Sequence, residues 1–372
     1  MKAVRLIDIT DIYKEIFEKK TKAKDTSVKK KKEFYSVLPA AGYAMSTGLT
    51  AVLSSSVSFF LDTNKSKLST ISANAYYTVY NQYWLQANSN ITDDDLKLNF
   101  TGDWRIYKFP TNTFGLGTDN NLSDALRIDF AYLKFYEVAS REIEPNFFVG
   151  LGYHLDYHWD IKAATSPDST YENVMDYGLN KQSITSGLSL NFMYDNRENP
   201  TNPSNGIYAA IQFRSNNKVI GSDYNSQSIL IDVRKYIKLP FNSDNVLAFW
   251  SYNSLTISGR LPYLDLPSTG WDASNNTGRG YIQGRYRGND FVDLEGEYRF
   301  KITNNGLLGG VVFANAESVS EFPTNKLTTI MIGKGLGLRI KINKNSRSNL
   351  CVDYGIGQGN SHGFSFNLGE VF

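Results

Sequence analysis

One segment of the chain combines a glycine-flanked basic loop with a strongly two-faced strand. It runs from Gly278 to Phe300 and reads GRGYIQGRYRGNDFVDLEGEYRF. Side chains of a strand alternate between its two faces. One face here would carry Val292, Leu294, Gly296, Tyr298, Phe300 and Ile302, and the other Asp293, Glu295, Glu297, Arg299 and Lys301. A packed soluble core does not tolerate such a row of charges, whereas the polar lumen of a membrane-spanning barrel does.

The composition favours strands over helices. Among 372 residues there are 24 Tyr, 22 Phe and 29 Gly, and only 20% are charged, which is typical of strands, turns and interfacial aromatic girdles. No apolar run approaches the roughly 18 residues of a membrane helix, so a helical membrane protein is excluded. The net charge of +2 is too small and too evenly spread to indicate a nucleic-acid partner, and the lone Cys351 excludes an internal disulfide.

Alternating segments follow one another from Phe34 to the last residue, and we count about sixteen from Pro39 onward. The joints between them fall into two sets. The short ones are Asn90–Asp95, Ser140–Glu144, Thr303–Asn305 and Lys344–Arg347, and the long ones include Phe109–Asp124, Ala163–Lys181 and Gly259–Asn289. Short periplasmic turns and long outer loops are typical of outer-membrane barrels. The sequence therefore predicts an all-β protein, a sixteen-stranded antiparallel transmembrane β-barrel over residues 34–372.

Residues 1–33 form a separate predicted unit. Apolar residues recur at helical spacing from Leu6 to Glu18, which predicts a short amphipathic helix, and a lysine-rich linker follows it up to Lys32. We interpret the helix as a docking or capping element; the alternative is a plug that enters the periplasmic mouth of the barrel. The apolar core of a secretory signal is missing, so we expect a native signal peptide to have preceded this start.

The triplet Arg279-Gly280-Tyr281 lies on what we count as the sixth outer loop. In that position it resembles the outer-membrane protein assembly and two-partner-secretion superfamily, also called the bacterial surface antigen family. The resemblance implies that the loop folds back into the lumen, where Arg279 meets acidic groups of the inner wall. A guanidinium is always charged and offers five donors in a rigid fork, so a buried one requires such partners.

The partner expected first is Glu297, from the run Glu297-Tyr298-Arg299-Phe300, with Glu295 as the second. On the following strand the family usually has Phe-x-Asp-x-Gly, and this chain has Asn315 at the acidic position. An asparagine accepts hydrogen bonds without a negative charge. We therefore expect the contact of Arg279 to depend more on Glu297 and Glu295.

Two further matches support the resemblance. The family's Asp-x-Arg-x-x-Pro-x-x-Pro-x-x-Gly turn corresponds to Asp195, Arg197, Pro200, Pro203 and Gly206, and we assign these residues the structural role of a rigid periplasmic turn. The end of the chain resembles the family's closing strand. Its alternation places Phe364, Phe366, Leu368 and Phe372 on one face, and we expect the terminal aromatic residue in the interfacial girdle.

The resemblance implies a mechanism and a location. A weak seam would join the first strand, near Tyr43, to the last, near Phe364–Phe372, so that an unpaired edge could template an incoming strand. The protein would take part in inserting, assembling or translocating outer-membrane or secreted proteins in a bacterial outer membrane. Its partners would be the lipid bilayer, periplasmic or outer-membrane proteins and client proteins, and no cofactor or metal would be needed.

One family feature is missing from this sequence. The stretch before Phe34 is too short for the periplasmic POTRA repeats, so the resemblance is to a member without them. This leaves a structural or channel-forming subunit of a larger complex as the alternative function. An enzyme is not expected, because the chain has only three histidines and a Ser-His-Asp constellation therefore has few ways to form. The row His154, Asp156 and His158 has zinc-ligand chemistry on one strand face, but we interpret it as part of a polar lumen wall.

Overall fold

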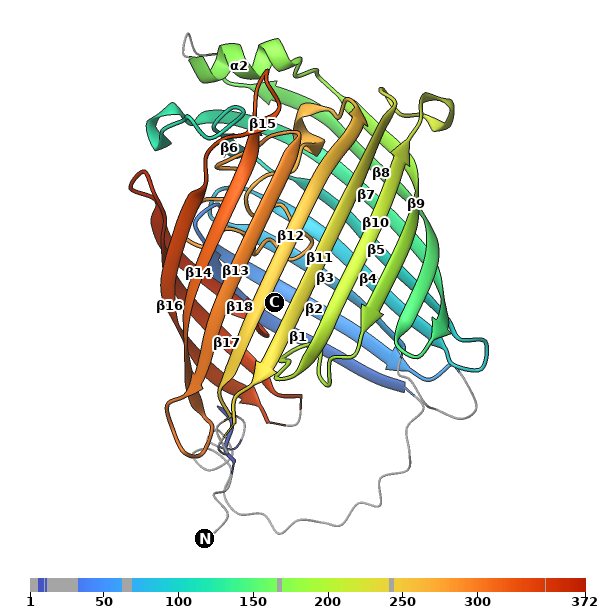
Figure 1. The fold of residues 1–372 in the computed structure, drawn as a ribbon, viewed down its shortest axis with the longest axis vertical. Helices are drawn as coiled ribbons and strands as arrows, with labels where there is room; N and C mark the ends of the chain where they lie inside the picture. Colours follow the sequence, from blue (N-terminus) through green and yellow to red (C-terminus); the bar gives the residue numbers. More distant parts are fainter. Residues whose placement is uncertain are drawn as a thin grey trace.

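The chain folds into a single barrel of antiparallel strands (Figure 1). The structure is a computed structural model that describes residues 6–9, 11, 33–61, 69–165, 169–240, 244–344 and 346–372. Its sheet has eighteen strands, of which β6 (Thr111–Thr113) and β15 (Lys326–Leu327) are short additions beside β7 and β14. The other sixteen form the barrel wall, so the predicted all-β fold with sixteen strands is confirmed.

Each wall strand pairs with the next one along the chain. The wall strands are β1 (Glu33–Ala44), β2 (Gly48–Phe59), β3 (Ser69–Thr78), β4 (Tyr83–Asp93), β5 (Leu98–Lys108), β7 (Leu126–Glu144), β8 (Phe147–Ala163), β9 (Ser183–Asp195), β10 (Gly206–Asn216), β11 (Ser226–Lys238), β12 (Val246–Gly259), β13 (Asp290–Lys301), β14 (Leu308–Glu321), β16 (Met331–Asn343), β17 (Ser348–Ile356) and β18 (His362–Leu368). The helical elements that lie wholly within the described ranges are α2 (Ser169–Tyr177) and three short 3-10 turns, η1 (Leu122–Asp124), η2 (Lys218–Ile220) and η3 (Tyr263–Asp265). This order is that of an up-and-down meander.

The wall is apolar outside and polar inside. On β13 the side chain of Leu294 is 58% exposed, whereas that of Asp293 is fully buried. A soluble protein has the opposite arrangement, because exposing apolar area to water costs free energy. An apolar outer face and a polar inner face are what a barrel in lipid requires. No helix among the described residues is long and apolar enough to cross a membrane.

The two ends of the barrel differ. One end carries short turns and the described N-terminal residues, and the other carries α2 and the long connections (Figure 1). We call them the turn end and the loop end. Two predicted turns were misplaced. The predicted turn Asn90–Asp95 overlaps the end of β4, and Ser140–Glu144 belongs to β7. The chain reverses direction only after β7, where Asn146 has φ of 66°. Both strands continue because their backbones keep pairing with β5 and β8.

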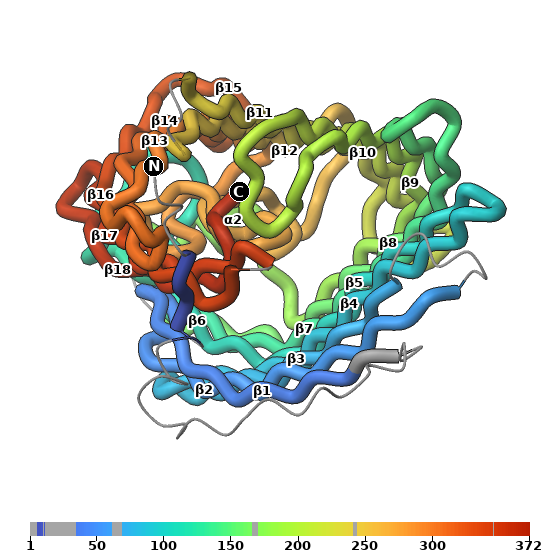
Figure 2. The backbone as a smooth tube through the Cα atoms, turned by 90° about the horizontal axis from the view of Figure 1, so that it is seen from below, coloured from blue at the N-terminus to red at the C-terminus, as the bar shows by residue number. Residues whose placement is uncertain are grey.

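A hydrophobic cluster closes the loop end. It joins inward side chains of the wall, such as Leu126 and Phe130, to Val174 and Tyr177 of α2 and to Leu261 of the long connection between β12 and β13. This connection, residues 260–289, passes inside the ring of strands when the barrel is seen from the turn end (Figure 2). We call it the lumen loop. The cluster fixes its first residues, and so determines where the rest of the loop meets the inner wall.

The predicted N-terminal helix over residues 6–18 lies largely outside the described residues. Those that are described lie at the turn end. The backbone N–H of Ile7 donates to the carbonyl of Asn305 over 3.1 Å, and the Lys344 ammonium contacts Asp11 at 2.7 Å. The hydrogen bond from Lys344 lowers the pKa of the Asp11 carboxyl below its usual range.

Candidate functional site in the barrel lumen

Arg279 is held inside the barrel by its glycine neighbours. Gly280 has φ of +106°, and a Cβ at this position would stand 3.0 Å from backbone atoms of Ile356 at the end of β17. Only glycine allows this conformation and this close approach together. The Tyr281 hydroxyl then donates to the Ile332 carbonyl over 2.7 Å. The Arg-Gly-Tyr triplet is therefore anchored on β16 and β17 while the arginine side chain turns toward other strands.

Three carboxylates surround the guanidinium of Arg279. Its Nη2 lies 2.6 Å from Glu297 Oε1 and 3.0 Å from Glu295 Oε2, and its Nη1 lies 2.9 Å from Asp353 Oδ2. The guanidinium carbon also lies 3.8 Å from the centre of the Phe313 ring. All of these charged side chains are at most 4% exposed. A buried charge is tolerated only when it is paired in this way.

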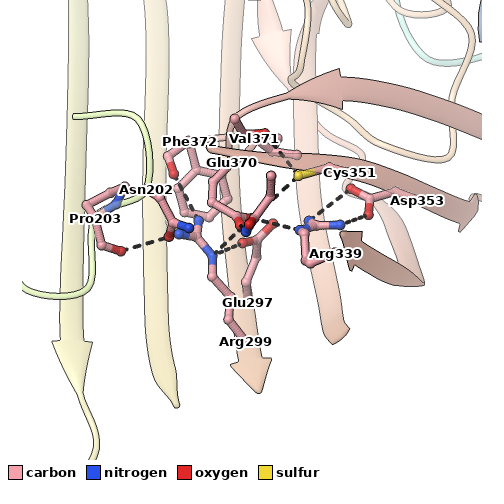
Figure 3. A network of polar contacts seen from close by, with 12 residues as sticks. Asn202, Pro203, Glu297, Arg299, Arg339, Cys351, Asp353, Glu370, Val371 and Phe372 are labelled. Carbon is pink, nitrogen blue, oxygen red and sulfur yellow. Dashed lines mark hydrogen bonds and ion pairs between the residues drawn. The ribbon is translucent and has the colours of Figure 1, made fainter. Parts of the chain in front are cut away.

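The contacts of Arg279 extend into a closed ring of alternating charges, much of which Figure 3 shows. Going round it, the members are Glu370, Arg339, Asp353, Arg279, Glu297 and Arg299. Arg339 Nε lies 2.7 Å from Glu370, and its Nη1 contacts Asp353. Arg299 Nε lies 2.7 Å from Glu297 and 3.8 Å from Glu370, which completes the circuit. We call this set the charge ring.

The last residues of the chain enter this ring from the turn end, which corrects the predicted position of Phe372. Strand β18 ends at Leu368, and Gly369, with φ of +90°, turns the backbone inward. Val371 and Phe372 are buried, and the Phe372 ring lies 5.2 Å from that of Trp250 on the inner wall. The expectation of a lipid-facing girdle residue was therefore wrong for Phe372, because the chain leaves the strand before reaching it.

Gly369–Phe372, which we call the tail, contacts several parts of the structure at once. The Val371 carbonyl accepts a 2.8 Å hydrogen bond from Asn276 of the lumen loop, and the Phe372 carbonyl accepts a 2.9 Å bond from Arg299 Nη2. The backbone N–H of Glu370 donates to Thr201, over 3.1 Å, in the turn between β9 and β10. The tail thus connects the lumen loop, the inner wall and a turn.

That turn contains the residues singled out from the sequence. Asp195 Oδ1 accepts from Arg197 Nε at 2.9 Å, and the Arg197 guanidinium lies 4.6 Å from the centre of the Tyr208 ring. Gly206 has φ of +108°. The Pro203 carbonyl lies 3.5 Å from Arg299 Nη1, whereas the neighbouring Pro200 is exposed. In this arrangement the turn lies directly beneath the tail.

Acidic side chains exceed the cations that face them in this part of the lumen. Asp293, next to the ring on β13, is buried, and neither of its carboxylate oxygens has a hydrogen-bond partner. Glu317 on β14 accepts from the Thr269 hydroxyl at 3.1 Å. Asn315, where the family pattern has an acid, donates its amide to the Arg279 carbonyl over 2.8 Å. Asn315 therefore contacts the loop backbone and not the guanidinium.

The first and last wall strands meet without a continuous pairing. No strand ladder joins β1 to β18 in the described ranges, although the Tyr43 and Phe366 rings make an edge-to-face contact at 6.1 Å. On the outer face of β18, Phe364 packs on Tyr354 at 4.8 Å. A cavity of about 450 Å³ opens between these two strands, the lumen loop and the inner wall. The barrel is thus nearly closed. We call the place where β1 and β18 lie side by side without a strand ladder the gap.

The histidine row of β8 makes ordinary lumen contacts. His154 Nε2 lies 2.7 Å from the Ser189 hydroxyl, Asp156 pairs with Arg214 at 2.7 Å, and His158 lies 3.4 Å from Asp265. Within the part of the chain that the structure describes, no group of acidic, histidine or cysteine residues has metal-binding geometry.

Comparison with known proteins assigns the family. A model described as the Omp85 superfamily domain matches residues 69–372, which is more than half of the chain. The chain belongs to the Omp85 superfamily. No curated protein matches it.

Two solved structures share this Omp85 fold. BamA from Haemophilus ducreyi lacking POTRA domains 1–3 is 17% identical, with a TM-score of 0.58 over 89% of this chain and 69% of that one. CdiB from Acinetobacter baumannii is 13% identical, with a TM-score of 0.58 over 91% of this chain and 60% of that one. At this identity the similarity is one of fold. The chain therefore spans about two thirds of the length of these structures.

Sequence reasoning named some members of the Omp85 lumen site and missed others. Arg279, Glu295, Glu297 and Arg299 lie together in the structure. Asp353, Arg339 and Glu370 were not chosen as partners. The signal that could have identified Glu370 is its place among apolar residues of the predicted lipid face, where a carboxylate is costly.

Proposed function

We propose that this chain is a bacterial outer-membrane barrel that helps to insert, assemble or translocate outer-membrane or secreted proteins through the gap between β1 and β18. The Arg279 triplet would hold the lumen loop in place during this work. Family membership supports the general activity. The observation that carries the proposal for this chain is the absence of a strand ladder between β1 and β18 among the described residues, although their side chains touch.

The physical argument concerns the unpaired backbone at that gap. In lipid every backbone N–H and C=O must find a partner, and each unsatisfied group costs several kcal/mol. An incoming client strand would satisfy those groups by adding to the sheet edge. Burial of the client's apolar outer face would then supply free energy without a nucleotide or another cofactor. Proposed partners are therefore the lipid bilayer, client proteins in extended form, and periplasmic or outer-membrane proteins that deliver them.

Locking the gap tests the proposal. Cysteines at Tyr43 and Phe366, whose rings lie 6.1 Å apart, should form a disulfide across it. We expect the oxidised variant to block client assembly or secretion, and a reductant to restore it. Cysteines at Tyr77 and Tyr83 are the matched control, because these exposed residues lie opposite each other on the paired strands β3 and β4.

The outer-membrane proteome provides the second measurement. Depleting the protein should remove many barrel proteins if it takes part in their assembly. An unchanged proteome and normal secretion, together with no effect of the oxidised pair, would refute the proposal. They would leave the alternative, a structural or channel-forming subunit of a larger complex.

A further inference from the structure

One carboxylate of the barrel wall points away from the lumen. Tyr136 of β7 faces inward, where its hydroxyl donates to Asp156 over 2.8 Å and accepts a 2.9 Å hydrogen bond from Arg214. Neighbouring side chains of a strand lie on opposite faces, so the next residue, Glu137, faces outward. It shares the outer face with Phe135, which is exposed. Glu137 therefore belongs to the face that lipid would cover.

Along the wall, Glu137 lies near the middle. The residue opposite it on β8 is Tyr153, which stands midway between Phe147 and Trp159. Phe147 begins β8 at the turn end, and Trp159 stacks on Tyr157 toward the loop end, with ring centres 5.0 Å apart. Aromatic residues of outer-membrane barrels gather at the two membrane interfaces. Glu137 therefore lies between the interfaces, where the wall would face hydrocarbon.

The charge of Glu137 is not compensated within the described part of the chain, where its carboxylate makes no hydrogen bond and no ion pair. The Tyr153 hydroxyl lies 3.0 Å from that of Ser186 on β9, so it is engaged elsewhere. Arg141, the next basic residue on the outer face of β7, stands about 13 Å farther along the strand. A carboxylate in hydrocarbon is costly unless a cation or a hydrogen-bond donor meets it.

Other polar groups gather beside this carboxylate. Gly102 of β5 lies opposite Glu137, and Ser89 of β4 lies opposite Gly102. A Cβ on Gly102 would stand 2.7 Å from Ser89 Oγ and 3.1 Å from Glu137 Oε1. It would also stand 3.0 Å from Cζ2 of Trp104, whose indole nitrogen is buried and has no hydrogen-bond partner in the described structure. We call Ser89, Gly102, Trp104 and Glu137 the outer polar patch.

The outer face around this patch carries several small residues. They are Ala73, Ala75, Ala87 and Ala139. Protein segments in a membrane associate by close packing and by hydrogen bonds between them, because lipid chains are as apolar as their side chains. Small residues permit the close approach, and the patch offers the polar contact. The strands that carry the patch, β4, β5 and β7, lie on the opposite side of the barrel from β13 and β14 (Figure 2).

We propose that the outer polar patch is a docking site for another outer-membrane protein, which places a lysine or arginine of a membrane-spanning segment beside Glu137. The charge identifies the partner, since a carboxylate without a cation in its own barrel is matched by a cation from outside. Lipid headgroups are charged too, but they lie at the membrane surface and not at this depth. The inference rests on the membrane location proposed above, and it is independent of the gap and of client assembly.

A second copy of this chain is a poorer match. In the described strands, the lysines and arginines that point outward lie near a strand end, away from the depth of Glu137. They are Lys108, Arg127, Arg141, Lys162, Lys235 and Lys334. A different protein with a cation at the middle of its wall is therefore the occupant that fits.

Photo-crosslinking in the native outer membrane tests the docking. The crosslinking residue p-benzoylphenylalanine replaces Ala139, which is exposed beside Glu137 on the same face. The matched control position is Leu336, which is 64% exposed on β16. We expect a protein crosslink from position 139 and none from position 336. Mass spectrometry should find a lysine or arginine on a membrane-spanning segment of the captured protein.

Dependence on the carboxylate decides whether the contact is the proposed one. Glu137→Gln should lower the yield of the crosslink roughly tenfold, because one charge-assisted contact contributes about that factor to an equilibrium constant. Glu144→Gln is the matched control: it makes the same change at the exposed turn end of the same strand, and the yield should stay as it was. Glu137→Lys, combined with glutamate at the partner's basic residue, should restore the crosslink.

Unfolding by urea in phospholipid vesicles tests the purified barrel without a partner. Glu137→Gln should raise the urea midpoint, because an amide faces lipid at a lower cost than a carboxylate. Glu144→Gln should leave it unchanged. A lower midpoint in Glu137→Gln would show that its own barrel holds the carboxylate, and would overturn the proposal.

The crosslinks are scored only in barrels with folded, heat-modifiable mobility. The proposal is overturned if position 139 captures only lipid or a second copy of this chain, or if the crosslink persists in Glu137→Gln. It is also overturned if the captured segment has no basic residue, or if the exchange of charges does not restore the crosslink. None of these measurements depends on client assembly, so the docking site and the proposed function can fail separately.

Discussion

Replacing Arg279 by alanine should be among the most damaging single changes in the barrel. The side chain is almost fully buried and lies within 3.0 Å of three carboxylates. Removing one partner of a buried ion pair typically costs about 3–5 kcal/mol, because it leaves an uncompensated charge. Two of the carboxylates keep another cation, since Asp353 also contacts Arg339 and Glu297 also contacts Arg299. Adding three pair energies would therefore overestimate the loss.

Glu295 determines the size of the effect. Apart from Arg279, its carboxylate accepts a 3.1 Å hydrogen bond from the Gly278 N–H, so the variant leaves it without a close cation. Loss of the guanidinium from the Phe313 ring, 3.8 Å away, adds to this. We expect a loss of about 4 kcal/mol, which is roughly a thousandfold in the folding equilibrium. The double variant Arg279→Ala, Glu295→Gln should recover part of it, because the stranded charge is then gone.

Unfolding by urea in detergent micelles, followed by heat-modifiable mobility, measures the loss, and trypsin resistance reports whether the lumen loop has left the wall. Arg347→Ala is the control. It breaks a pair with Glu198 of 2.7 Å whose side chains are about half exposed, and such pairs contribute about 0–1 kcal/mol. If Arg279→Ala proved no more harmful than Arg347→Ala, or if Glu295→Gln gave no relief, the ionic account of the site would be wrong.

Two further changes test neighbouring features. Asp293→Asn should raise resistance to urea by about 1–3 kcal/mol, because it neutralises a buried carboxylate that has no hydrogen-bond partner. A loss of stability would show instead that the Asp293 carboxylate has a partner of its own. Gly280→Ala should lower the stability of the barrel by on the order of 1–3 kcal/mol and expose the lumen loop to trypsin. The reason is that Gly280 has φ of +106° and that a Cβ there would approach the Ile356 backbone to 3.0 Å. Wild-type protease resistance in that variant would contradict this anchoring.

The barrel could be predicted from the sequence because its pattern is local. In a membrane-spanning strand every second side chain is apolar and faces the lipid, and this holds whichever strands lie beside it. Leu294 and Glu295 can therefore be placed without any knowledge of the other strands. The turns were less predictable, since alternation continues across residues such as Ser140 that belong to the strand.

The partners of Arg279 could be predicted only in part. Glu295 and Glu297 follow the triplet closely along the chain, so the start of β13 had to bring them near it. Asp353 is 74 residues away from Arg279, and nothing in its own alternating strand distinguishes it from the other inward polar residues. Which of these meets the loop depends on how far the loop reaches across the lumen, and that distance is set by the hydrophobic cluster at the loop end.

The tail was mispredicted because one backbone angle overrides the pattern. Phe364, Phe366, Leu368 and Phe372 keep the period of two, yet the positive φ of Gly369 turns the last residue inward. Glu370 contradicted the lipid-facing reading in the sequence itself, because a carboxylate on that face is costly. In the structure this carboxylate lies 2.7 Å from Arg339 Nε, which explains why the strand ends where it does.

The neutral residue at Asn315 also follows from the balance of charge in the lumen. From the family pattern we expected that, without a carboxylate at position 315, the ionic contact of Arg279 would depend more on Glu295 and Glu297. In the structure Asp353 supplies a further carboxylate, so Arg279, Arg299 and Arg339 already face Glu295, Glu297, Asp353 and Glu370. An aspartate at position 315 would add a fifth anion to the four that face these three cations, near Asp293, whose carboxylate oxygens have no hydrogen-bond partner. The Asn315 amide avoids that repulsion and still donates to the Arg279 carbonyl. A neutral residue at position 315 therefore fits a site in which Asp353 of β17 supplies the further carboxylate for Arg279.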